Sequence, residues 1–376
     1  MAMKKSKPRT QSSYSWHSAS LLRVNMPFVP NLTRFANPSC LQREECETRR
    51  AVRAFRVRGK VFWKNLKKPI YALAPMAGVT DSAFRQICKD FGADIVYSEM
   101  ASATALVYNP KKTLEILKFS EKERPYVVQL FGSKPEHFAY AVQLIEKKVK
   151  PDGIDINFGC PVKKVLKQGA GAALMDNLKL AREVVKNVID NTALPISLKL
   201  RSKASNVDAL RFLDYMGGLD IKAMMIHGRT LAQGFTGEVD WKIIKKARNY
   251  FGGIILANGG VNTAEDALEL LKRTGADGVG IARGALGKPW IFEEVRSKKL
   301  SPQMRDGEVR SKKEIFRVAL KHARLAEKLK GREGIIEMRK HLCWYVAGLP
   351  GASELRHKLV KVEKLEDVKK ILKLEI

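Results

Sequence analysis

From Pro69 onwards the chain alternates between short apolar runs rich in β-branched residues and longer stretches whose apolar residues recur with helical spacing. Strands that alternate with helices predict a parallel sheet covered on both faces. Eight such units between residues 61 and 295 favour an α/β fold, the closed (β/α)8 TIM barrel, over an open sheet, because that barrel takes ~250 residues. The predicted strands are Ile70–Ala74, Ile95–Ser98, Tyr126–Leu130, Gly153–Asn157, Ile196–Leu200, Ala223–His227, Ile254–Asn258 and Gly278–Ile281.

After Val295 the strand pattern ends and only helical spacing remains. Residues 313–330, 332–347 and 352–373 are predicted to be helices, so we expect a barrel over 61–295 and a small all-helical C-terminal domain over 296–376. Helices are also predicted between the strands, among them Pro135–Val149, Leu178–Asp190, Asp240–Asn249 and Ala264–Arg273.

Residues 1–56 are rich in Ser, Arg and Asn and show no sustained periodicity. This composition predicts a basic, disordered N-terminal extension. The other interpretation left open is that the segment is not native, because the true start lies later, at Val57 or Val61. We assign the segment no function.

The chain carries a formal net charge of +30, of which +10 lies in residues 1–60 and +11 in residues 296–376. Such an excess predicts an extended polyanion as partner, because lysine and arginine gain affinity by displacing counterions from phosphates. Nucleic acid is therefore the expected partner, and a generally basic or salt-adapted surface is the alternative.

The cysteines are scattered and form neither a CxxC pair nor a Cys/His cluster, which favours a reducing compartment and no metal. No apolar stretch approaches the ~18 residues that span a bilayer, and the N-terminus lacks the apolar core of a signal peptide. We expect a cytoplasmic monomer without membrane contact. The five cysteines are Cys40, Cys46, Cys88, Cys160 and Cys343.

In a barrel of this type the active site lies at the carboxyl ends of the strands. A small apolar turn after the first predicted strand lets a flat ligand approach the backbone. The turns after strands seven and eight offer backbone N–H groups, the usual phosphate position. These features predict a slot for a flat phosphorylated cofactor such as FMN, with a plain sugar phosphate as alternative. The strand-end residues are Pro75, Met76, Ala77, Gln129, Lys199, His227, Asn258, Gly259, Gly260, Ala282 and Arg283.

A single thiol, Cys160, stands in the turn NFGCP (157–161) that closes the fourth predicted strand. A tight turn after a buried strand holds and aims the sulfur, whereas a structural thiol more often lies inside an apolar run. Chemistry is thus the favoured interpretation, and packing is the alternative. Basic residues near these strand ends are candidates for holding a nucleic-acid backbone, or else form a solvated charged face: Lys163, Lys164, Arg201 and Arg229.

Seven motifs between Phe62 and Gly348 resemble those of the tRNA-dihydrouridine synthases. They are APMAGVTDSAFR (74–85), VVQLFGS (127–133), DINFGCPVKKVLKQGAGAALM (155–175), SLKLR (197–201), HGRTLAQGFTG (227–237), ANGGV (257–261) and ARGALGKPWIF (282–292). The resemblance implies an FMN-bound barrel, a helical RNA-binding domain, and NADPH-driven reduction of the C5–C6 double bond of uridines in tRNA. It also implies that Cys160 is the proton donor and that the eleven strand-end residues line the FMN. Gly260 stands where some relatives carry Asp, and residues 1–56 have no counterpart.

The chemistry of Cys160 agrees with that role. Hydride addition to uracil C6 leaves an enolate that needs a proton at C5. A thiol with an unperturbed pKa of ~8.5 is mostly protonated at neutral pH and still acidic enough to donate. The base must leave its stack to reach the thiol, which agrees with an open barrel mouth.

Two other functions stay open. An FMN-dependent dehydrogenase of a free pyrimidine could use the same cysteine, but it has no use for the charge or for a basic helical appendage. A catalytically silent RNA-binding barrel would have no need of Cys160, Lys199 and the phosphate turns. Flavin absorbance of the purified protein excludes the silent barrel.

Overall fold

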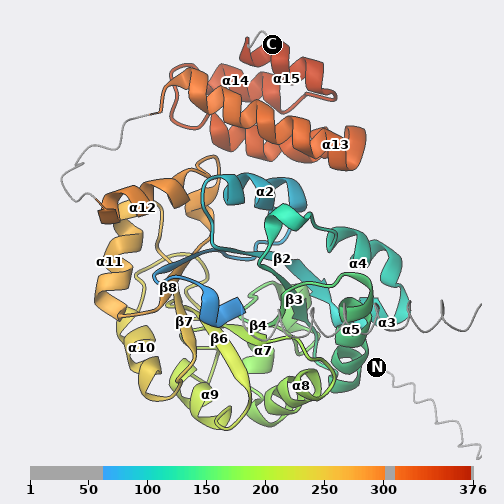
Figure 1. Cartoon of the computed structure of the whole chain (residues 1–376), viewed down its shortest axis with the longest axis vertical. Coiled ribbons are helices and arrows are strands. Elements are labelled where there is room, and N and C mark those ends of the chain that lie inside the picture. The colour runs from blue at the N-terminus through green and yellow to red at the C-terminus, as the bar shows by residue number, and fades with distance from the viewer. Residues whose placement is uncertain (1–61, 301–309, 374–376) are drawn as a thin grey trace, which may run out of the picture. The chain divides into compact units, whose positions relative to one another are not determined.

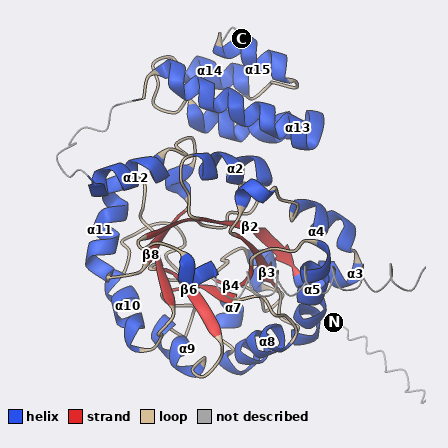
Figure 2. Cartoon of the chain, viewed as in Figure 1, coloured by secondary structure: helices blue, strands red, loops and turns tan. Residues whose placement is uncertain are grey.

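The computed structural model describes residues 62–300 and 310–373, and the extension predicted over 1–56 lies outside them. Within the described residues, eight parallel strands close a barrel in sequence order, with β8 hydrogen-bonded to β1 (Figure 1). Helices surround the strands (Figure 2). The predicted (β/α)8 barrel with a helical C-terminal region is confirmed.

Every strand coincides with a predicted apolar run, and β7 and β8 agree residue for residue. The largest difference is β2, which runs four residues beyond the predicted end, to Ser102. Its register shifts between Tyr97 and Met100, and this irregularity carries the strand past Glu99, whose charge interrupts the apolar pattern. The strands are β1 (Ile70–Leu73), β2 (Ile95–Ser102), β3 (Tyr126–Phe131), β4 (Gly153–Phe158), β5 (Ile196–Arg201), β6 (Ile221–His227), β7 (Ile254–Asn258) and β8 (Gly278–Ile281).

Short polar side chains cap several barrel helices, as at Asp81 and Thr263, whose oxygens accept from backbone N–H groups of the first turn. The helix predicted over 240–249 divides into α10 and a 3₁₀ turn (Ala247–Asn249), whereas α8 agrees with its prediction. The helices are α2 (Ser82–Asp90), α3 (Ala103–Tyr108), α4 (Pro110–Ile116), α5 (Pro135–Lys148), α6 (Lys163–Leu166), α7 (Ala172–Met175), α8 (Leu178–Asp190), α9 (Ala209–Tyr215), α10 (Trp241–Lys246), α11 (Ala264–Thr274) and α12 (Ile291–Leu300).

Side chains alternate along each strand between the barrel interior and the layer beneath the helices. On β4, Ile154 and Ile156 belong to the large apolar layer between strands and helices. A second apolar cluster, which includes Tyr97, Met225 and Leu256, fills the interior of the barrel. The interior also holds buried polar side chains, among them Gln129, Asp155 and Ser197.

Three further helices follow: α13 (Lys312–Tyr345), α14 (Ala352–Leu359) and α15 (Leu365–Leu372). Gly331 interrupts α13 with φ 60°, which confirms the predicted boundary between 313–330 and 332–347. The single helix predicted over 352–373 is wrong, because the chain leaves helical geometry after α14 and Lys364 is extended. That turn buries both Val362 and Leu365. Helix α12 crosses residue 295, so the domain limit there stays a prediction.

The C-terminal helices pack against α2 of the barrel. Ala83 of α2 belongs to the same apolar cluster as α13, α14 and α15. The Phe84 ring stacks on His322, with ring centroids 5.6 Å apart. Lys330 Nζ donates to the Asp81 carboxylate at 2.8 Å. The barrel residues in these contacts, Asp81, Ala83 and Phe84, follow directly after the turn that closes β1.

A buried ion pair holds α2 to the 3₁₀ turn (Glu121–Glu123) before β3. Arg85 Nε and the Glu123 carboxylate are 2.5 Å apart, and both side chains are fully buried. Arg85 also donates to the carbonyls of Thr80 and Lys118. Removing one member of such a pair leaves a buried charge without its partner.

Glu123→Ala is expected to lower the free energy of unfolding by about 3–5 kcal/mol, because Arg85 would stay charged and buried. Urea denaturation followed by circular dichroism measures the change. Glu115→Ala is the matched control, since Glu115 pairs with Lys118 at the surface, where such pairs contribute about 1 kcal/mol or less. Equal losses in the two variants would contradict the role of the buried pair.

Candidate active site

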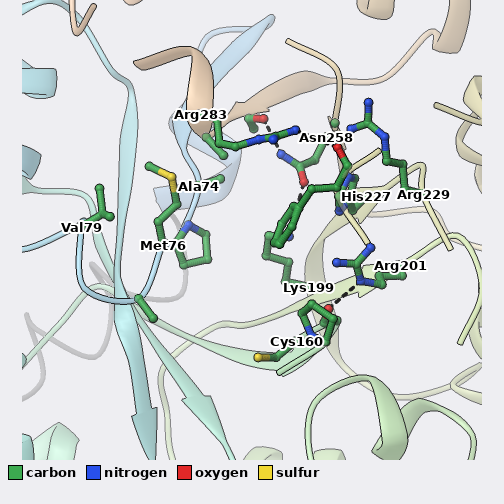
Figure 3. Close-up of a pocket in the computed structure, with 18 of the residues that line it drawn as sticks. Ala74, Met76, Val79, Cys160, Lys199, Arg201, His227, Arg229, Asn258 and Arg283 are labelled. Carbon is green, nitrogen blue, oxygen red and sulfur yellow. Dashed lines mark hydrogen bonds between the residues drawn. The ribbon is translucent and has the colours of Figure 1, made fainter. Parts of the chain in front are cut away.

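A cavity of about 400 Å³ lies at the carboxyl ends of the strands (Figure 3). Its volume is in the range of small-molecule sites. All eleven predicted strand-end residues line it, and so does Cys160. They come from the ends of seven different strands, so only closure of the barrel brings them together.

The turn that carries Cys160 is held by the side chain of Asn157. Asn157 Oδ1 accepts from the backbone N–H groups of Gly159 (3.1 Å) and Cys160 (2.9 Å). Gly171 lies behind the turn with φ +62°, and a Cβ there would be 2.9 Å from the carbonyl oxygen of Cys160, so glycine is required. The thiol borders the cavity (Figure 3). Burial raises the pKa of the Cys160 thiol, which keeps it protonated at neutral pH.

Buried polar side chains form a continuous hydrogen-bonded chain that ends at Asn157. Asn157 Nδ2 donates to Gln129 Oε1 (2.9 Å), and Gln129 Nε2 donates to Asp155 Oδ2 (2.7 Å). Ser197 Oγ donates to the other oxygen of Asp155 at 2.6 Å. Burial raises the pKa of Asp155 to about 6, and its two hydrogen-bond donors oppose that effect. At neutral pH the carboxyl group is therefore mainly ionised.

Lys199 and His227 lie at the centre of the cavity and differ in charge. Burial lowers the pKa of Lys199 to about 8, while the attraction of Asp155 opposes the shift. The Lys199 ammonium lies 3.4 Å from Asn258 Oδ1. Burial, together with repulsion from Lys199 and the neighbouring arginines, lowers the pKa of His227 to about 2. At neutral pH the lysine is mainly charged and the imidazole is neutral.

The turns after β7 and β8 form the positive end of the cavity. Gly259 and Gly260 have φ +108° and +74°, which glycine adopts without strain. In the described part of the chain, the backbone N–H groups of Gly260 and Val261 have no protein acceptor. The Arg283 guanidinium donates to the carbonyl of Phe235 and lies 5.3 Å from its ring centroid. Free N–H groups beside an arginine suit a phosphate.

The four predicted nucleic-acid residues fall into two pairs. Arg201 is buried in the cavity wall, where its guanidinium donates to three backbone carbonyls. Arg229 lines the same wall and donates to one carbonyl. Lys163 and Lys164 are exposed on α6, just after the Cys160 turn and outside the cavity lining. Contact of these residues with nucleic acid stays a prediction.

The lining residues that were not expected from the sequence include Met100, Phe235 and Trp344. Met100 lies on the part of β2 beyond its predicted end. Phe235 is 55% exposed, and its position in the motif HGRTLAQGFTG beside two glycines was a usable signal. Trp344 had no such signal, because only the packing of α13 brings it to the cavity.

Within residues 62–300 and 310–373, no group of three or more His, Cys, Asp or Glu side chains is arranged to hold a metal ion. Over the same ranges, no helix combines the length and the apolar composition needed to cross a bilayer.

A family model described as dihydrouridine synthase (Dus) matches residues 72–376. The probable tRNA-dihydrouridine synthase of Aquifex aeolicus is 34% identical over 309 residues, which cover 81% of this chain and 96% of that protein. The tRNA-dihydrouridine synthase B of Pseudomonas aeruginosa is 35% identical over 293 residues, covering 76% of this chain and 86% of the relative. The probable tRNA-dihydrouridine synthase of Mycobacterium tuberculosis strain H37Rv is 34% identical over 321 residues, 81% of each chain.

Among solved structures, histamine dehydrogenase from Rhizobium sp. 4-9 aligns with a TM-score of 0.48 and 12% identity, over 68% of this chain and 48% of that one. A likeness at this level carries no functional argument. The family match and the sequence relatives, in contrast, each span most of the chain. The chain therefore belongs to the dihydrouridine synthase family and is an oxidoreductase.

Proposed function

We propose that the protein reduces the C5–C6 double bond of uridines in tRNA, with FMN in the barrel cavity and NADPH as the source of electrons. Its relatives are tRNA-dihydrouridine synthases. The observation that carries the proposal is that the Cys160 thiol borders a cavity with a phosphate-type end and a central lysine. A proton donor and a place for a flat anionic cofactor thus share one cavity.

The residues around the cavity fit FMN. The free N–H groups of Gly260 and Val261, with the Arg283 guanidinium, suit its phosphate. Met76 and its small neighbours offer apolar surface for a flat ring, and Lys199 offers a positive charge. When bound, the reduced flavin supplies the hydride that uracil C6 receives.

Cys160 donates the proton that uracil C5 needs once C6 has received a hydride. The S–H bond breaks, a C5–H bond forms, and the thiolate regains a proton from solvent. Asn157 holds the turn that aims this thiol. Lys199 lowers the cost of negative charge in the cavity, and the neutral His227 can donate an N–H without adding repulsion.

Folded tRNA is the proposed partner, in agreement with the net charge of +30. We assign FMN binding to 61–295 and RNA binding to 296–376, with Lys163 and Lys164 at the edge of the cavity mouth. Arg201 and Arg229, being in the cavity wall, reach the RNA only at the nucleotide that is reduced. The protein is further proposed to be a cytoplasmic monomer that needs no metal.

Cys160→Ala is expected to slow dihydrouridine formation about 10²-fold or more, the usual contribution of a positioned general acid. The measurement is a single-turnover reaction of pre-reduced enzyme with unmodified tRNA, followed by mass spectrometry of the nucleosides. Flavin absorbance of the variant checks that the cavity is intact. Cys343→Ala is the matched control, because this thiol lies outside the cavity lining. Dihydrouridine formation at the wild-type rate in Cys160→Ala would contradict the assignment of Cys160 as the proton donor.

The same assay separates the alternative functions. Flavin absorbance and activity on tRNA, without activity on free pyrimidines, excludes both the silent barrel and the free-pyrimidine dehydrogenase. Activity on a free pyrimidine alone would replace the proposed function.

Reduction of the bound flavin by NADPH is expected to slow as the pH rises through about 8, the pKa of Lys199. The ammonium is present below this pKa and lost above it, so negative charge in the cavity is less stabilised at high pH. Lys199→Met should slow flavin reduction at pH 7 about tenfold or more, the effect of ~1.4 kcal/mol. Lys199→Arg, which keeps the charge, should remove the decline at high pH.

Stopped-flow flavin absorbance under anaerobic conditions measures these rates. Lys186→Met is the matched control, since Lys186 is exposed and pairs with Asp190 on α8. If Lys199→Met holds full flavin and is reduced at the wild-type rate, Lys199 is structural.

Replacing both Lys163 and Lys164 by alanine is expected to weaken tRNA binding and to flatten its salt dependence. Each lost phosphate contact reduces the slope of log affinity against log salt by ~0.7–0.9. Fluorescence anisotropy over a salt series measures the slope. Lys222→Ala is the control, because Lys222 pairs with Asp220 at the amino end of β6. Unchanged slopes in the double variant would assign the two lysines to a solvated surface.

A further inference from the structure

The steps described above make no use of Asp155, although it is fully buried next to the active site. It lies on β4, two residues before Asn157 and on the same face of the strand. A charge inside a barrel is costly unless hydrogen bonds compensate it. Asp155 has two such bonds, from Gln129 Nε2 (2.7 Å) and Ser197 Oγ (2.6 Å). It therefore stands at one end of the hydrogen-bonded chain whose other end is the Cys160 turn.

The chemistry of the two ends dictates how both amides between them must point. An ionised carboxylate can only accept, so Gln129 presents its NH2 group to Asp155. The carbonyl oxygen of Gln129 then faces Asn157, which must present its own NH2 group. Asn157 Oδ1 is left for the N–H groups of Gly159 and Cys160, which can only donate. Neither amide can flip without placing two donors or two acceptors face to face.

We propose that Asp155 is a positioning residue of the active site, which orients the amides of Gln129 and Asn157 and through them holds the turn that aims Cys160. The same hydrogen-bonded chain determines which amide atoms face a ligand, since Gln129 and Asn157 both line the cavity. The proposal rests on the proposed function for its activity readout only.

The hydrogen-bonded chain needs residue 155 to present an acceptor to Gln129. In Asp155→Asn the amide oxygen can still face Gln129, provided that its NH2 group turns to Ser197 Oγ, because a hydroxyl can accept as well as donate. In Ser197→Ala, Asp155 keeps its charge and remains an obligatory acceptor. In the double variant the amide at position 155 has lost both its charge and the Ser197 hydroxyl that would orient it, so both downstream amides can flip.

The double-mutant cycle of Asp155→Asn and Ser197→Ala therefore tests the proposal. Each single variant should keep kcat for dihydrouridine formation within about threefold of wild type. In the double variant, the fold-loss of kcat should exceed the product of the two single-variant losses by about tenfold or more. A misplacement of ~1 Å is enough for such a loss. KM for tRNA should change less than kcat, because all four side chains of the hydrogen-bonded chain are buried.

The pH profile supplies a readout that a merely structural role would not move. The titratable groups that face Asp155 are Lys199 on β5, which favours its ionised form, and Tyr97 on β2, whose pKa lies well above the usual range. In the wild type a protonated Asp155 can turn its O–H to Ser197 Oγ and keep its carbonyl oxygen for Gln129, as the amide of Asp155→Asn does, so turnover should hold as the pH drops through about 6. Ser197→Ala should show an acid limb, because the protonated carboxyl then lacks this acceptor, and the limb should lie above that pH, since the lost hydroxyl stabilised the carboxylate. The double variant, which has no carboxyl at position 155, should show no such limb.

A large loss in Asp155→Asn alone would overturn the proposal, because it would show that Asp155 acts by its charge. Additive effects of the two substitutions would overturn it as well, because they would show no shared orientation. If the wild-type protein does not reduce uridine in tRNA, the proposed function fails separately. The double-mutant cycle is then measured by the rate at which Cys160 is alkylated, which peptide mass spectrometry follows. The same non-additivity is expected in these rates.

Discussion

Polar groups inside the barrel have to find their hydrogen-bond partners within the barrel, and the site is built on this constraint. The register of the strands satisfies this constraint directly. Gln129 of β3 is the register partner of Asp155 on β4, which is in turn the register partner of Ser197 on β5. The side chains of all three point inward at the same level and bond to one another. The level above carries Asn157 beside Lys199, so the ordered chain of bonds leads to the cavity.

The charge of the cavity follows from the way its cations are held. Among the described residues, Arg201, Arg229 and Arg283 are fixed by backbone carbonyls rather than by carboxylates. Their charge is therefore not cancelled. Burial, with repulsion from Lys199 and these arginines, lowers the pKa of His227 and keeps the imidazole neutral. A cavity with this electrostatic balance favours an anionic, phosphorylated ligand. All three arginines brace the loop after β6, and Arg201 also binds the turn after β4, so they shape the cavity and charge it at once.

Much of the fold and most of the cavity could be predicted from the sequence, because their signals are local. A strand buried on both faces is a short apolar run, so all eight strands were found and the errors lie at their ends. Where a charge interrupts the run, as Glu99 does in β2, the prediction stopped too early and missed Met100. The glycines and Cys160 stood out because tight turns at strand ends restrict the residue types that fit.

What only the tertiary structure decided depends on contacts between residues far apart in the chain. Arg201 looked like a surface cation in the sequence, but strand pairing places it in the cavity wall. Trp344 reaches the cavity only because α13 packs against the barrel. The role given to Asp155 could not be predicted either, since a hydrogen-bonded chain across β3, β4 and β5 requires their register. Sequence thus determined which residues stand at strand ends, whereas barrel closure determined which of them meet, because register and packing join positions that no local pattern connects.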